Sequence, residues 1–123
     1  MITLTIKEIS QYRNQLAIYS EALVALDMLE DCEGSLEDAA LALAIQAGQQ
    51  PDRINWLDGI AKRYRTVICQ AEFREDLTNN NVSLMVKHLI EQKVCPAVLA
   101  AIVVIYIVEQ GVEDFCQPLE LKL

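Results

Sequence analysis

The chain has 123 residues, 53% of them apolar, and a formal net charge of −8. This length suits one ordinary domain, and the apolar fraction is too high for a disordered chain. The excess of carboxylates argues against binding to nucleic acid or to anionic membranes, since both attract Lys and Arg. We therefore expect a cytoplasmic protein that binds neither nucleic acid nor membrane.

The first predicted helix covers residues 6–30. Thr5 and Glu8 have the spacing of a capping box, in which each side chain bonds a free backbone amide of the first turn. Apolar residues then recur every three or four positions, which predicts one buried stripe. The stripe consists of Ile9, Tyr12, Leu16, Tyr19, Leu23 and Leu26. A second apolar set, Ile18, Ala22, Ala25 and Leu29, lies roughly opposite. Such a helix is either sandwiched inside the domain or offers an outer face to a partner.

Two further helices are predicted over residues 36–47 and 52–73. Ser35 is a typical N-cap for the first of them, and Gly48 is placed to end it. The second is the clearest amphipathic helix, and Asp58 and Lys62 stand four residues apart on its polar side. Trp56 borders its apolar arc, either as the edge of the core or as an interface anchor. Residues 74–81 form the longest polar stretch, which predicts a linker.

The last two helices are predicted over residues 82–93 and 96–110, followed by a tail over residues 112–123. Residues 94–108 contain no charged side chain. This segment is short for a membrane span, which needs about 20 apolar residues, so it should lie in the middle of the domain. The tail should pack as a turn and an extended end. We therefore expect an all-α single domain: an antiparallel bundle of about five helices around a buried, fully apolar C-terminal helix.

Candidate reactive residues are few. The four cysteines at 32, 69, 95 and 116 have no metal-ligand spacing, so we interpret them as small core hydrophobes with reduced thiols. His88 is the one histidine, and His88 with Glu91 has the reverse order of the Glu-x-x-His element of di-metal bundles. No nucleophile, phosphate-binding or dinucleotide-binding motif occurs. The sequence thus predicts no catalytic, cofactor-binding or metal-binding residue.

The expected function is a non-enzymatic protein-interaction or regulatory domain that self-associates as a homodimer. The generous apolar content and the two apolar faces of the first helix support this interpretation. The expected contact residues are Tyr12, Ile18, Leu29 and Trp56. Two alternatives stay open at this point. One is a small acidic inhibitor or mimic of a basic target protein, and the other is a helical bundle that binds a small ligand beside the 94–108 helix.

Overall fold

A computed structural model describes residues 2–51 and 55–120. These residues form nine α-helices and one isolated antiparallel bridge between Thr3 and Ser35, so the all-α expectation is confirmed. The expected count of five helices is wrong, because two of the predicted helices are broken and the tail is helical. The predicted helix start at residue 52 and the end of the tail at 121–123 lie outside the described residues.

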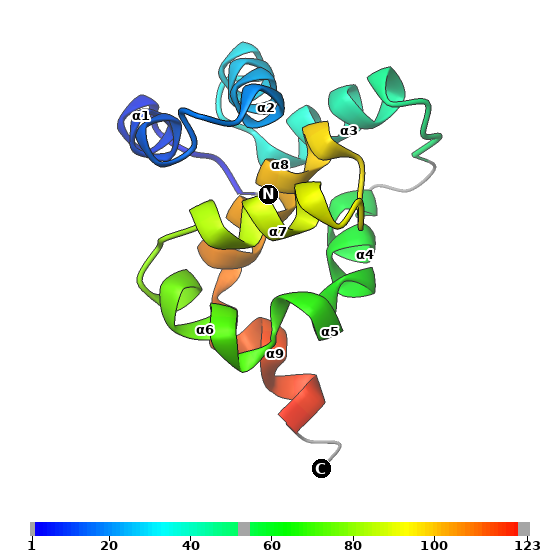
Figure 1. Cartoon of the computed structure of the whole chain (residues 1–123). Coiled ribbons are helices and arrows are strands. Elements are labelled where there is room, and N and C mark those ends of the chain that lie inside the picture. The colour runs from blue at the N-terminus through cyan, green and yellow to red at the C-terminus, as the bar shows by residue number, and fades with distance from the viewer. Residues whose placement is uncertain (1, 52–54, 121–123) are drawn as a thin grey trace.

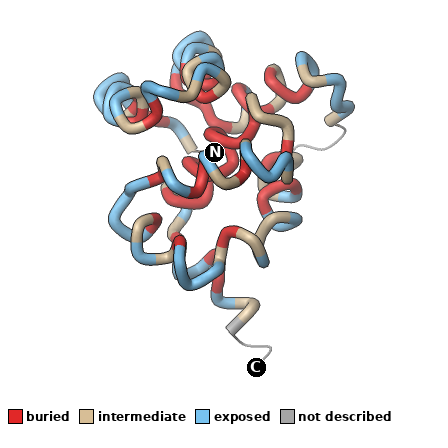
Figure 2. The backbone as a smooth tube through the Cα atoms, in the orientation of Figure 1, coloured by how far each residue is buried: buried red, intermediate tan, exposed pale blue. Residues whose placement is uncertain are grey.

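The apolar C-terminal helix is the centre of the fold. α8 (Ala97–Gln110) buries every residue from Leu99 to Val108. It packs against α2 (Ser20–Asp31), α3 (Leu36–Gln46), α4 (Trp56–Arg63), α7 (Ser83–Glu91) and α9 (Val112–Glu120). Figure 1 shows these helices around it, pointing in different directions, and Figure 2 shows the buried stretch at the middle of the molecule. No helix in the described ranges is long and apolar enough to cross a membrane.

The expected single helix over residues 6–30 is in fact two helices. α1 (Ile6–Gln15) ends at Leu16, and a turn leads through Tyr19 into α2. The turn lets α1 fold back against α2, while α2 itself packs against α3 and α8. Most of the two apolar faces predicted for the long helix is therefore covered inside the chain. Ala22, Ala25 and Leu29 are fully buried, so the expectation of an outer face is wrong for these three residues, while Ile18 in the turn is 83% exposed.

The predicted helix over residues 52–73 and the linker after it also differ from the structure. This region forms α4, the short α5 (Arg65–Ile68) and α6 (Ala71–Thr78). Phe73 and Leu77 stand one helical turn apart and are both buried, which extends the helix into the polar stretch. The tail is likewise helical: α9 buries Val112, Phe115 and Cys116 at helical spacing.

The local signals at helix ends are confirmed. Thr5 Oγ1 accepts from the Glu8 amide at 3.1 Å, and Glu8 accepts from the Thr5 amide at 2.9 Å, which completes the capping box. The Ser35 hydroxyl caps α3 through the Asp38 amide. Gly48 and Gly111 follow α3 and α8 with positive φ, as a helix-ending glycine requires.

Candidate functional site

The start of α1 and the end of α2 form a corner of the molecule where an exposed apolar side chain borders a hollow. A groove of about 420 Å³ is lined by Leu4, Ile6, Ile9, Glu30, Glu33 and Gly34. Leu4 and Ile9 are almost fully buried, whereas the Ile6 side chain is 83% exposed. We call these six residues the corner groove. It has an apolar floor, one protruding apolar side chain and a carboxylate rim.

Backbone contacts between the N-terminal segment and the α2–α3 loop build the corner groove. The Leu4 amide donates to the Gly34 carbonyl at 2.9 Å, and the Leu36 amide donates to the Ile2 carbonyl at 3.1 Å. Gly34 has φ +86°, and a Cβ at this position would overlap the Leu4 carbonyl oxygen. Only glycine lets the two segments approach this closely. This loop therefore fixes Leu4 beside Ile9 and presents Glu33 at the rim.

The electrostatic field at the corner is negative. Arg13 is the basic residue that pairs there, and its guanidinium contacts Asp27 at 2.7 Å and Glu30 at 2.9 Å. These contacts raise the pKa of Arg13, with Asp27 as the leading cause, so its charge is already engaged. Further carboxylates follow in the same part of the sequence: Asp31, Glu37 and Asp38.

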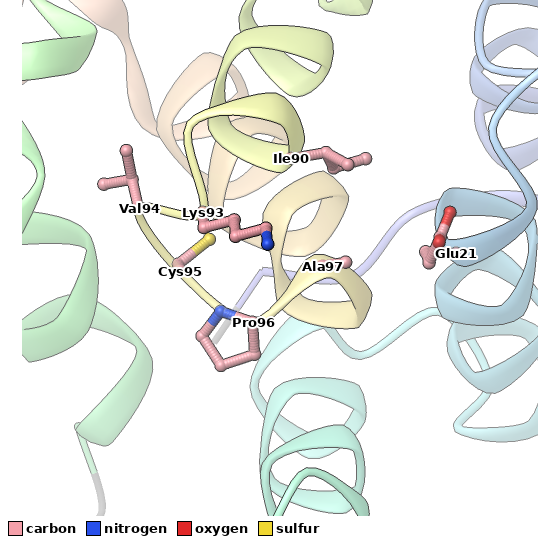
Figure 3. Close-up of a pocket in the computed structure, with 7 residues that line it drawn as sticks. All are labelled: Glu21, Ile90, Lys93, Val94, Cys95, Pro96 and Ala97. Atoms are coloured by element: carbon pink, nitrogen blue, oxygen red, sulfur yellow. The ribbon is translucent and has the colours of Figure 1, made fainter.

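A second hollow lies where α7 meets α8. It has a volume of about 560 Å³ and is lined by Glu21, Ile90, Lys93, Val94, Cys95, Pro96 and Ala97. Figure 3 shows Glu21 of α2 across the pocket from Cys95 and Pro96. Burial raises the pKa of the Cys95 thiol to about 12. Because the thiolate is the nucleophile, this raised pKa disfavours a nucleophilic role for Cys95 at neutral pH.

The structure separates the residues expected to form the contact surface. Ile18 is 83% exposed on the turn between α1 and α2, and Trp56 is half-buried at the start of α4. Tyr12 and Leu29 are in the core, at 5% and 0% exposure, so in this conformation neither can touch a partner. Tyr12 belongs to the stripe that the periodicity predicted to be buried, and Leu29 is covered by the helices that pack against α2.

Sequence reasoning missed the residues of the corner groove. Ile6 shares the helical stripe of Ile9, so the pattern alone would bury it. Its exposure arises because Ile6 lies in the first turn of α1, at the rim of the domain. Glu33 and Gly34 lie in the polar break between the helices predicted over residues 6–30 and 36–47. Only the pairing of residues 2–4 with residues 34–36 brings these residues together.

The interpretation of the cysteines is corrected in part. Cys69 and Cys116 form a disulfide with a Cα–Cα distance of 5.7 Å, although they are 47 residues apart in the chain. Cys95 is a buried free thiol, and Cys32 is free and half-buried. His88 lies with its ring centroid 5.0 Å from that of Phe73. Within residues 2–51 and 55–120, no group of three or more His, Cys, Asp or Glu side chains could hold a metal ion.

Comparison with protein-family models, with characterised proteins and with solved structures found no significant match to this chain. Its function is therefore inferred from its own residues.

Proposed function

We propose that this chain is a non-catalytic protein-interaction domain that binds a basic, apolar segment of another protein in the corner groove. The observation that carries the proposal is Ile6, which is 83% exposed beside a hollow with an apolar floor. Burying one Ile side chain at an interface contributes about 1.5–3 kcal/mol. The groove has room for an apolar side chain of the partner to pack between Ile6 and the buried Leu4 and Ile9.

The charge of the corner selects the chemistry of the partner. Glu33 is exposed and forms no ion pair within residues 2–51 and 55–120, and Glu30 shares Arg13 with Asp27. With a net charge of −8 on the whole chain, a Lys or Arg beside the inserted apolar residue would gain favourable Coulomb energy at this rim. A segment with one apolar face and one basic face therefore fits both the apolar floor and the carboxylate rim of the corner groove.

The same charge argument bears on the homodimer expected from the sequence. Two copies that met through the corner groove would bring their carboxylates together, at a cost in free energy. We therefore propose a different protein as the partner, which combines the interaction-domain interpretation with the acidic-mimic alternative. Sedimentation velocity at high micromolar concentration should show a monomer. A dimer that disappears in Ile6→Ser would assign the groove to a second copy and overturn the proposal.

The direct test uses a synthetic Leu/Lys peptide of about 18 residues with its leucines at helical spacing. Titration into the isotope-labelled protein should shift the NMR signals of Ile6, Ile9 and Glu33. Affinity should fall as salt is added, because the rim charges are exposed. Ile6→Ser should weaken binding about tenfold or more, since 1.4 kcal/mol is tenfold in Kd.

Matched variants distinguish binding in the corner groove from nonspecific electrostatic attraction of the peptide to an acidic protein. Ile45→Ser removes a side chain that is 65% exposed on α3, away from the groove, and should leave binding unchanged. Glu33→Lys should weaken binding more than Glu91→Lys, which makes the same change of charge on α7. Equal effects of Ile6→Ser and Ile45→Ser, or equal effects of the two charge reversals, would contradict the proposed site.

A further inference from the structure

α9 is joined to the rest of the domain by a covalent bond as well as by packing. The disulfide links Cys116 of α9 to Cys69, the residue that ends α5. Figure 1 shows α9 beside α5 and α6 at the end of the molecule away from α1 and α2. We propose that the Cys69–Cys116 disulfide is a reversible redox latch that holds α9 against α5 and α6, and that a cellular dithiol opens it.

The noncovalent anchorage of α9 rests on few fully buried side chains. Within residues 112–119, Val112, Phe115 and Cys116 are buried, Pro118 and Leu119 are half-buried, and the other three residues are exposed. The Arg65 guanidinium lies over the Phe115 ring, 4.9 Å from its centroid, and adds one cation–π contact. A nine-residue helix is marginal in water without tertiary support. The disulfide is therefore a large part of what keeps α9 in place.

Gly111 allows α9 to move without disturbing the core helix. It separates α8 from α9 and has φ +119°, a conformation that other residues rarely adopt. α8 packs against four other helices besides α9, so we expect it to keep its place when α9 moves. Leu77 of α6 lines a hollow that also contains Val108 and Val112. Release of α9 about Gly111 would uncover this apolar surface of α6.

The two sulfurs differ in access, which sets the direction of the exchange. Cys69 is half-buried and Cys116 is 1% exposed, so Cys69 is the cysteine of the pair that we expect a thiolate to attack. Attack there forms a mixed disulfide with Cys69, breaks the Cys69–Cys116 bond and releases Cys116 as a thiolate, which takes up a proton. The second thiol of the dithiol then displaces Cys69 as a thiol. The protein gains two electrons and two protons, and the dithiol leaves as its own disulfide.

This chemistry is consistent with the expected cytoplasmic setting. A reducing compartment supplies dithiols that break such a bond, and disulfides that form there are usually transient. In an oxidising compartment the latch would stay closed. The latch is independent of the corner groove, because it lies on α5, α6 and α9 and shares no residue with it.

Hydrogen–deuterium exchange of the full chain, with and without tris(carboxyethyl)phosphine, tests the latch. Alkylation of the denatured, non-reduced chain and its intact mass should first show one disulfide and two alkylated thiols. Reduction should then speed amide exchange within α9 about tenfold or more, while α2, α3 and α8 keep their protection. Reoxidation should restore the original pattern.

Cysteine variants show whether the effect of the reductant comes from the Cys69–Cys116 disulfide. Cys69→Ser/Cys116→Ser should show fast α9 exchange at all times and no response to the phosphine. Cys32→Ser/Cys95→Ala keeps the disulfide and should respond like the unmodified chain. Four free thiols before reduction, an α9 that stays protected after it, or loss of protection throughout the domain would each overturn the latch.

Discussion

The Tyr12 hydroxyl donates a hydrogen bond to Glu109 Oε2 at 2.9 Å, which joins α1 to the end of the central helix across 97 residues of sequence. Glu8, the partner of Thr5 in the capping box of α1, lines the same small cavity as Tyr12 and Glu109. Burial raises the pKa of Glu109, the Tyr12 hydroxyl opposes this rise, and the neighbouring Glu8 adds to it. The junction therefore holds two carboxyl groups that repel each other when both are ionised.

We expect Glu109→Gln to stabilise the chain at neutral pH and not in acid. Because the pKa of Glu109 is higher in the folded chain, its neutral form supports the fold below the ordinary Glu pKa. That support is lost as pH rises through the raised value. A glutamine stays neutral, accepts from Tyr12 and can donate to Glu8. Urea unfolding should show no gain near pH 4 and a gain of up to about 1 kcal/mol at pH 7, since the carboxyl is half-exposed.

Two variants serve as controls for this junction. Tyr12→Phe removes the donor and should cost about 1 kcal/mol, with the larger loss at pH 7, because the Tyr12 hydroxyl favours the ionised form of Glu109. Glu91→Gln changes an exposed carboxylate on α7 and should leave the pH profile unchanged. An equal effect of Glu109→Gln at pH 4 and pH 7 would refute the assignment of the pH dependence to Glu109.

Replacing Gly34 or Gly59 by alanine should change the free energy of unfolding in opposite directions. A Cβ on Gly59, within α4, would meet no atom within 4 Å, so the close approach that a helix glycine can permit is absent. Gly59→Ala should raise the free energy of unfolding by about 0.5–1 kcal/mol through helix propensity. Gly34→Ala should lower it by about 2 kcal/mol or more, because of its positive φ and the overlap with Leu4. Chemical denaturation measures both, and a stable Gly34→Ala would contradict the geometry of the corner.

Truncation of the central helix should be far more costly than truncation at the surface. Ile102 of α8 is fully buried, and Ile102→Ala should lower the free energy of unfolding by about 2–5 kcal/mol through lost burial and a cavity. Ile45→Ala, which shortens a side chain that is 65% exposed, should change it by less than about 0.5 kcal/mol. Similar losses for both variants would mean that α8 is not the core element. Thermal unfolding provides an independent measurement.

The sequence alone determined the features that depend on neighbours a few residues apart. The uncharged run at 94–108 required a central helix, and Thr5 with Glu8, Ser35 and Gly48 marked helix ends correctly. Caps and periodicity are local, since a helix is closed by hydrogen bonds between residues four apart.

Tertiary structure decided everything that depends on distant residues. The turn at residues 16–19 carries no Gly or Pro, and it forms because folding α1 back against α2 buries most of both apolar faces. The disulfide needed α5 and α9 to meet, and the corner groove needed the N-terminal segment to pair with the α2–α3 loop. Tyr12 and Ile6 lie on the same helix, yet Tyr12 is buried and Ile6 is exposed. A helical stripe shows which face of α1 is apolar, but only the tertiary structure shows how far along α1 the neighbouring helices cover it.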